Sequence, residues 1–445
     1  MNKEVKVVKK KRKLNWQKIF NLISFTFILA CIIFYGTRFI RLYLQNNKKE
    51  EIKVLADNIK DNNEGNLKNI NSDYYFTGKE VNNYVKYSNI LFRIIKINKD
   101  NSITLISDKP ITSLAKGDNN DYKTSYINHW LNNQDKENTG ILEKNLNNPN
   151  KYLTYTNACN DKIDNTKNIT CKSTLADTLI TLPSLYDYIN TGDTKSFMNN
   201  ETYYYLLNTN KDNKTWYIND NGGVTTSDNT DILGIKPVIT LKSTNKLING
   251  DGTKDNPYTF EEEQSILGSY VKLGNDTWRV YDIDDNNLKL SLDNYLKINN
   301  EEITYKYSDK GYYHNDGKQG TLAYYLNKNY LSKLTYSSNI IEANYANGIY
   351  SNTTNYDYTK VLNKTIPTKV ATLSIGNIII NSDNTNYYLS TGVDTNSNLV
   401  YVMTNDFKLY TKNATSKLKI VPVITIDKKI LTSGDGSQNS PLEAK

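Results

Sequence analysis

The chain has 445 residues, enough for two or three domains, and its hydrophobic fraction of 38% is low for a globular protein. Its formal net charge is +8, but the excess of basic residues lies in residues 1–18 and the remainder is close to neutral. This distribution argues against nucleic-acid binding, which requires a basic surface on the folded domain. Asn, Lys, Ile and Tyr are abundant, as is typical of AT-rich codon usage, so their abundance says little about function.

The N-terminal residues predict a membrane anchor. A cytoplasmic basic tail, residues 1–18, precedes a charge-free run at 19–37. We take residues 19–40 as a transmembrane helix, because about 20 helical residues cross a hydrocarbon core of roughly 30 Å. Basic residues before the run favour a cytoplasmic N-terminus. A cleaved signal peptide is the alternative, although no A-x-A-like site follows. The C-terminal bulk is then expected outside the cell, held at the membrane by one helix.

Residues 41–73 are predicted to form a polar stalk. Leu44, Ile52, Leu55 and Ile59 have near-helical spacing in its first part. The stretch DNNEGNLKNINSD that follows is typical of a flexible linker.

Two long stretches of the chain then recur. YVKYSNILFRIIKINKDN at 84–101 returns as YVKLGNDTWRVYDIDDNN at 270–287, and residues 236–257 return at 421–441. Phe92 corresponds to Trp278 (278 − 92 = 186) and Pro237 to Pro422 (422 − 237 = 185). A nearly constant shift indicates a duplicated domain rather than a solenoid of short repeats. We therefore predict module one at 74–262 and module two at 263–445.

Within each module the pattern predicts antiparallel strands with short helices, an α+β fold. In module one, residues 91–97 and 102–106 alternate as a β-hairpin. TSYINHWLNN predicts a helix capped by Ser125, and LPSLYDYINTG a second helix with Pro183 in its first turn and Gly192 at its C-terminal cap. Trp130 and Trp278 are assigned to the core.

Cys159 and Cys171 lie close together in one polar loop of module one, and module two has no cysteine. In an exported protein this pair predicts a disulfide, which would stabilise the fold by roughly 3 kcal/mol. Two free thiols are the alternative.

The motifs FTGKEVNNYVKYSNILFRIIKIN, YINHWLNN, ITLPSLYDYIN and IKPVITLK resemble a family of uncharacterised surface modules in membrane-anchored proteins of AT-rich Gram-positive-type bacteria. The family has no assigned activity. Trp130-Leu131-Asn132 and the LPSLYDY segment are also distantly similar to C-type-lectin-like folds, including the formylglycine-generating-enzyme branch. That likeness implies a fold only, because the paired catalytic cysteines of the branch have no counterpart near the final strands.

Catalytic signatures are scarce. The only histidines, His129 and His314, are not equivalent in the repeat, and no metal-ligand cluster or nucleotide-binding loop occurs. NGDGTKDNP lacks the terminal Glu of an EF-hand, and a Gly-rich turn is the favoured interpretation over calcium binding. We therefore predict no cofactor, no metal and no catalytic residue.

A Tyr or Trp ring can stack on a sugar because it combines an apolar face with a polar edge. The candidates are Tyr204, Trp216, Tyr312 and Tyr313. The leading hypothesis is a non-enzymatic surface binding or adhesion protein for a glycan, an envelope component or a protein partner, with two modules on a flexible stalk raising the effective concentration. A carboxylate-based glycosidase and a structural spacer in a membrane complex are the alternatives.

Overall fold

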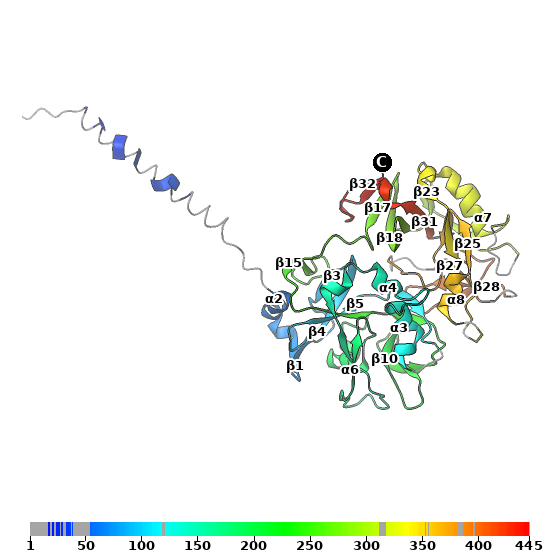
Figure 1. The fold of residues 1–445 in the computed structure, drawn as a ribbon, viewed down its shortest axis with the longest axis horizontal. Coiled ribbons are helices and arrows are strands. Elements are labelled where there is room, and N and C mark those ends of the chain that lie inside the picture. The colour runs from blue at the N-terminus through cyan, green and yellow to red at the C-terminus, as the bar shows by residue number, and fades with distance from the viewer. Residues whose placement is uncertain are drawn as a thin grey trace, which may run out of the picture. The chain divides into compact units, whose positions relative to one another are not determined.

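The computed structural model describes residues 54–117, 121–310, 317–351, 353–354, 356–380, 386–394 and 397–444, together with scattered residues between 17 and 38. It divides into two compact units, Met1–Ile52 and Lys53–Lys445 (Figure 1). The described residues of the first unit are helical, and most of the predicted tail and membrane-spanning run lies outside them. Within the described residues, no helix is both long and apolar enough to cross a bilayer.

The second unit is built mainly from β-strands with a few short helices, so the predicted α+β class is wrong, and the described residues do not show the predicted N-terminal transmembrane helix. Between residues 54 and 444 the described α-helices contain only three to eight residues each. They are α2 (Leu55–Asn62), α3 (Tyr126–Leu131), α4 (Ile141–Asn145), α5 (Pro149–Tyr152), α6 (Leu185–Asn190), α7 (Leu322–Tyr324) and α8 (Tyr358–Asn363). Most of the core is therefore made by side chains of strands.

Each module contains one large and one small sheet. The large sheet of module one has the order β1-β2-β4-β5-β14-β7, with β3 beside β4. Its strands are β1 (Leu67–Ile70), β2 (Asp73–Phe76), β3 (Tyr84–Tyr87), β4 (Ile90–Ile97), β5 (Ile103–Ser107), β7 (Leu153–Thr154) and β14 (Val238–Leu241). The large sheet of module two contains β17 (Tyr270–Leu273), β18 (Asp276–Asp284), β19 (Asn287–Leu292), β23 (Ile340–Ile341), β26 (Val370–Thr372), β31 (Pro422–Asp427), β32 (Leu431–Ser433) and β33 (Leu442–Ala444).

The small sheets have the same strand order in both modules. It is β12-β11-β10-β13-β6 in module one and β29-β28-β27-β30-β22 in module two. The first comprises β6 (Thr112–Leu114), β10 (Tyr204–Thr209), β11 (Thr215–Ile218), β12 (Val224–Ser227) and β13 (Leu233–Ile235). The second comprises β22 (Thr304–Lys306), β27 (Tyr387–Gly392), β28 (Leu399–Met403), β29 (Tyr410–Asn413) and β30 (Lys417–Lys419). In each, one central pair is parallel, whereas the sequence suggested antiparallel pairing throughout.

Two-stranded hairpins and the turns of the duplicated motifs complete the modules. The hairpins are β8 (Thr156–Cys159) with β9 (Thr174–Thr178), β15 (Leu247–Asn249) with β16 (Thr259–Phe260), β20 (Lys297–Ile298) with β21 (Glu301–Glu302), and β24 (Ala343–Ala346) with β25 (Thr365–Thr368). Gly250 and Gly434 occupy matching turns at φ +106° and +88°, where an added Cβ would meet the carbonyl group of Pro257 or Pro441. NGDG and SGDG are thus turn motifs.

Local capping agrees largely with the sequence pattern. The hydroxyl of Ser125 accepts a hydrogen bond from the amide of Asn128 (3.1 Å), which confirms it as the N-cap of α3. Helix α6 begins later than predicted, because Ser184 caps it through the amide of Asp187 (3.0 Å), so that Pro183 precedes the helix.

The end of the predicted stalk is folded. Helix α2 buries Leu55, Ala56 and Ile59, and the large sheet of module one is extended by β2, which pairs with β4, and by β1, which pairs with β2. The ammonium of Lys96 on β4 lies 3.5 Å from the carboxylate of Asp187 on α6 and donates a hydrogen bond to the hydroxyl of Tyr75 on β2 (3.0 Å). The hairpin β1–β2 therefore covers an outer face of module one.

The two modules pack against each other within the one compact unit. Buried apolar side chains of module one continue into those of module two in a single cluster. The indole N–H of Trp130 donates to the carbonyl of Gly376 (2.8 Å), and the amide of Ile379 donates to the carbonyl of Ile111 (2.7 Å). Because these bonds are buried, the two modules are held together within this unit and are not joined by a flexible linker.

Glu262, at the end of module one, lies in a pH-sensitive contact. Its carboxylate accepts hydrogen bonds from the amide of Ser88 (2.9 Å) and the side chain of Asn147 (3.1 Å). Burial raises the pKa of Glu262 from 4.5 to about 6, against the lowering effect of those hydrogen bonds. The folded protein thus binds this proton more tightly than the unfolded chain does.

We expect the free energy of unfolding to fall by at most about 2 kcal/mol as the pH rises from about 4.5 to about 6, since each pH unit in that window contributes about 1.4 kcal/mol. Urea unfolding at several pH values should show this slope in the wild type and not in Glu262→Gln. Glu261 is the exposed neighbour of Glu262, and Glu261→Gln is the control. In this variant the free energy of unfolding should depend on pH as in the wild type. An unchanged slope in Glu262→Gln would assign the titration to another group.

Candidate functional site

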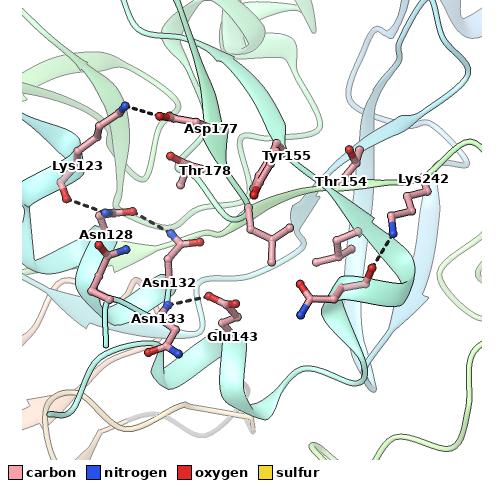
Figure 2. A pocket seen from close by; sticks show the side chains of 14 residues that line it. Lys123, Asn128, Asn132, Asn133, Glu143, Thr154, Tyr155, Asp177, Thr178 and Lys242 are labelled. Atoms are coloured by element: carbon pink, nitrogen blue, oxygen red, sulfur yellow. Dashed lines mark hydrogen bonds and ion pairs between the residues drawn. The ribbon is translucent and has the colours of Figure 1, made fainter. Parts of the chain in front are cut away.

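A groove with a volume of about 580 Å3 lies in module one. We call it the amide groove, because amide side chains dominate its lining (Figure 2). The lining residues are Lys123, Asn128, Asn132, Asn133, Gln134, Glu143, Asn150, Leu153, Thr154, Tyr155, Asp177, Thr178, Leu179 and Lys242. They come from both ends of α3, from α4 and α5, and from the strands β7 and β9 and the end of β14.

The floor of the amide groove is fixed by Asn132, the asparagine of the WLN motif. Its side chain donates to the carbonyl of Ile180 (2.8 Å) and accepts from the amide of the same residue (3.0 Å). Asn327 makes the same pair of bonds to Val370 in module two (2.8 and 3.0 Å). Both asparagines tie the helix to a neighbouring segment, so the repeated motif has a structural role.

Other polar side chains of the groove keep hydrogen-bonding capacity. No described residue bonds to the side chains of Gln134, Asn150 or Thr154. Asn133 uses its main-chain amide to donate to the carboxylate of Glu143 (2.7 Å). Amide groups carry both donors and acceptors, and they are available here for a polar ligand.

Tyr155 supplies the aromatic surface of the groove. It is 63% exposed, the most exposed tyrosine described in the second unit, and Figure 2 shows it beside Thr178 across from Asn132 and Glu143. The strand residues that follow explain its position, because Thr156 and Ala158 point into the core while Asn157 is exposed. Tyr155 therefore presents an open ring at the rim of a polar cavity.

The charges of the groove balance. The ammonium of Lys123 lies 2.6 Å from the carboxylate of Asp177, and Lys242 donates to the carbonyl of Asn150 (2.6 Å). The hydrogen bond from Lys123 lowers the pKa of Asp177, so this carboxylate stays ionised. With Glu143 as the second acid, two positive and two negative groups line the cavity, which suits an uncharged ligand.

The residues predicted to stack on a ligand lie elsewhere. Tyr204 is fully buried, with its hydroxyl donating to the carbonyl of Met198 (3.0 Å) and the ammonium of Lys236 4.8 Å from its ring centre. Its prediction as a binding residue is wrong, because no face of the ring reaches solvent. Trp216 is half-buried and donates to the carbonyl of Ile163 (2.8 Å), outside the amide groove.

Tyr312 and Tyr313, like His314, lie outside the described residues. His129 is half-buried on α3 and does not line the groove. The tryptophans assigned to the core, Trp130 and Trp278, are both fully buried, as predicted.

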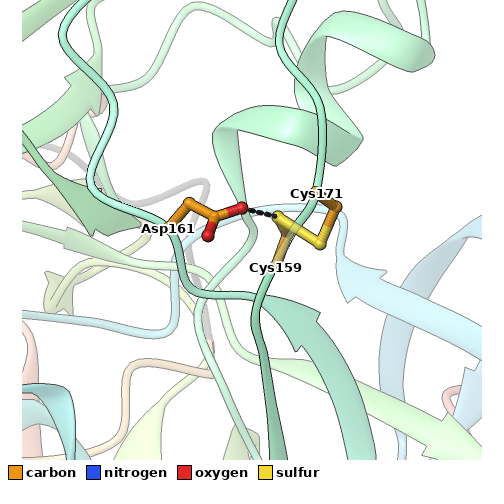
Figure 3. Close-up of side chains that lie close together, drawn as sticks. All are labelled: Cys159, Asp161 and Cys171. Atoms are coloured by element: carbon orange, nitrogen blue, oxygen red, sulfur yellow. Dashed lines mark hydrogen bonds between the residues drawn. A yellow bond between two sulfur atoms is a disulfide. The ribbon is translucent and has the colours of Figure 1, made fainter.

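The two loop cysteines are joined as predicted. Cys159 and Cys171 form a disulfide with their Cα atoms 5.6 Å apart (Figure 3). Asp161 lies beside the bridge, and the three side chains are the one group within the described residues whose atoms are close enough to hold a metal ion. Both sulfurs are used in the bridge, and the carboxylate accepts from the amides of Lys172 (2.7 Å) and Ser173 (3.1 Å). These three side chains therefore hold the loop together and do not form a metal site.

Tyr155 was not among the residues predicted to bind: each of those candidates has an aromatic residue next to it in the sequence, whereas Tyr155 lies between two threonines. The alternation of Thr156, Asn157 and Ala158 was the available signal. The resemblance to surface modules and to lectin-like folds stays a prediction. No family model, curated protein or solved structure matches the chain.

Proposed function

We propose that this protein is a non-enzymatic binding protein of the cell exterior, and that the amide groove holds an uncharged, hydroxyl-rich ligand such as a surface glycan. The observation that carries the proposal is the exposed ring of Tyr155 at the rim of a cavity lined by amide and hydroxyl side chains. The disulfide between Cys159 and Cys171 supports a location outside the reducing cytoplasm.

The chemistry of the lining matches that ligand class. A sugar ring presents hydroxyl groups at its edge and C–H groups on its faces. Amide side chains donate and accept hydrogen bonds with such hydroxyls, and a tyrosine ring offers an apolar surface to the C–H face. The cavity is open and pre-formed, as small-ligand sites usually are.

A glycosidase is the second candidate, because two carboxylates, Glu143 and Asp177, line the same groove. A glycosidase needs one carboxylic acid that is protonated near neutral pH. The lowered pKa of Asp177 beside Lys123 opposes that role. In such an enzyme Asp177 would be the ionised carboxylate and Glu143 the acid, and this remains the second candidate.

The proposal predicts a loss of affinity when the ring of Tyr155 is removed. The purified full chain is screened on a glycan array, and the dissociation constant of a hit is measured by calorimetry. We expect Tyr155→Ala to raise this constant about tenfold, or about 1.4 kcal/mol, as burial of roughly 55 Å2 of ring surface would give. Asn150→Ala should also weaken binding, because it removes a side-chain amide from the lining.

Tyr410→Ala serves as the matched control, since Tyr410 is also exposed but lies on β29, away from the groove. If Tyr155→Ala and Tyr410→Ala lose equal affinity for the glycan, the amide groove is not the binding site. Release of sugar from a bound glycan, abolished by Glu143→Gln, would favour the glycosidase. If no glycan binds the chain, the proposal is wrong and a structural role gains support.

A further inference from the structure

One arginine occurs at the same place in both modules. Arg93 on β4 corresponds to Arg279 on β18 (279 − 93 = 186). Each guanidinium lies over a tyrosine ring and beside an aspartate. The partners are Tyr84 (3.9 Å) and Asp108 (3.7 Å) for Arg93, and Tyr270 (4.0 Å) and Asp293 (3.6 Å) for Arg279. The two arginines therefore have similar surroundings, and differences between them are informative.

Every guanidinium nitrogen of Arg93 has a hydrogen-bond acceptor. Its Nε donates to the side-chain oxygen of Asn83. Its Nη1 donates to the hydroxyl of Tyr84 (2.9 Å), and its Nη2 donates to the carbonyl of Val81 (3.1 Å). Arg93 thus uses its guanidinium within module one, where it holds the chain before β4 in place.

Arg279 retains unused donors. Its Nε donates to the carbonyl of Gly268 (2.8 Å), because the position of Asn83 is taken by Ser269 (269 − 83 = 186). No described residue accepts a hydrogen bond from its Nη1 or Nη2. The carboxylate of Asp293, 3.6 Å from Nη1, forms an ion pair that is longer than a hydrogen bond. The end of this side chain can therefore still bind an acceptor.

The contact between the modules explains the missing acceptor. The carbonyl of Leu267 corresponds to that of Val81 (267 − 81 = 186), but it accepts from the side-chain amide of Asn89 in module one (3.0 Å). A Cβ added at Gly268 would lie 2.9 Å from the Cβ of Asn89 and 3.6 Å from Nη2 of Arg279. The end of Arg279 is therefore close to Asn89, at the boundary with module one.

At this boundary Arg279 lines a cavity of about 210 Å3, which we call the cationic cavity. Lys109 and Lys254 of module one line it as well, and Asp108 is the one carboxylate of the lining. Asp108 is paired with Arg93 (3.7 Å). Three positive groups and one negative group give the lining a formal charge of +2 (3 − 1 = 2), whereas the charges of the amide groove balance. The cationic cavity therefore favours an anion.

The remaining wall of the cationic cavity is largely aliphatic. Ile90 and Ile111 of module one and Ile379 of module two line it, and all three are buried. A small, compact anion would leave this surface without contact. An acid with an aliphatic body would cover it, while its carboxylate could take two parallel hydrogen bonds from one guanidinium.

We propose that the cationic cavity binds a small carboxylic acid with a short aliphatic body. The carboxylate accepts hydrogen bonds from Nη1 and Nη2 of Arg279 and lies near Lys254, and the body packs against Ile111 and Ile379. The acid therefore contacts both modules. The proposal is independent of the glycan site, because the cationic cavity and the amide groove share no residue.

Calorimetry on the full chain tests the ligand class, with isovalerate as the probe in a buffer free of phosphate and of other carboxylates. We expect saturable binding at one site per chain. Isovaleramide has the same shape without the charge, and acetate has the charge without the aliphatic body. Each should bind about tenfold more weakly or worse. These comparisons use the wild type, so they do not depend on how any variant folds.

Two variants test the place of binding. Arg279→Gln should weaken isovalerate binding about tenfold or more, because it removes the charged donors, and Lys254→Gln should weaken it less. Lys246→Gln is the matched control for Lys254→Gln, since both lysines are exposed but Lys246 lies outside the cavity. Its affinity should equal that of the wild type. Circular dichroism establishes that each variant is folded.

Three results would overturn the proposal. The first is the absence of saturable isovalerate binding to the wild type. The second is equal binding of isovaleramide or of inorganic phosphate, because the cavity would then not select an aliphatic carboxylate. The third is unchanged affinity in folded Arg279→Gln, which would place the binding site elsewhere on the chain.

Discussion

Replacement of Trp130 by alanine is expected to lower the free energy of unfolding by about 3–5 kcal/mol, the usual cost of removing a fully buried large aromatic side chain. Trp130 is completely buried where α3 meets module two, and its indole donates to the carbonyl of Gly376. The substitution leaves both a cavity and an unsatisfied carbonyl between the modules. Urea unfolding followed by circular dichroism measures the loss.

Two further variants separate the contributions. Trp130→Phe keeps much of the ring but loses the N–H donor, and should cost about 1–3 kcal/mol, because a buried acceptor is left without a partner. Trp216→Ala removes a half-buried indole that bonds within module one, and should cost less than Trp130→Ala. If the two alanine variants lose equal stability, Trp130 is not a main link between the modules.

The second large effect is expected at the buried charges between β2, β4 and α6. Burial alone would lower the pKa of Lys96, but Asp187 and Asp73 raise it, so the side chain is charged. Lys96→Met leaves the buried carboxylate of Asp187 without its cation. We expect a loss of about 3–5 kcal/mol in the free energy of unfolding, measured by urea titration.

A double variant tests whether the unpaired carboxylate of Asp187 causes the loss of stability in Lys96→Met. Asp187→Asn keeps a side chain of the same shape beside Tyr75 and Ser184 but removes the charge. Lys96→Met with Asp187→Asn should therefore be more stable than Lys96→Met alone. Lys123→Met breaks the exposed pair with Asp177 and should cost less than about 1 kcal/mol. A double variant that is no more stable than Lys96→Met would contradict the role assigned to the charge.

Features set by short-range chemistry could be predicted from the sequence. Ser125 is followed by an apolar helical pattern, and it caps α3. The twelve-residue spacing of Cys159 and Cys171 allowed the bridge that is present. The duplicated NGDG and SGDG turns occur at matching places with left-handed glycines. In each case the physical cause lies within a few neighbouring residues, so one sequence contains the necessary information.

The tertiary structure alone decided how the modules meet and which aromatic rings are open. Tyr204 and Tyr155 both lie in β-rich stretches, yet the first is fully buried and the second is 63% exposed. Residues 54–73 have the polar composition of a linker. They nevertheless fold onto module one, where α2 and the hairpin β1–β2 cover its outer face. Burial depends on contacts between residues far apart in the chain. The duplication could therefore be predicted from the sequence, whereas the exposure of each aromatic ring was decided by tertiary packing.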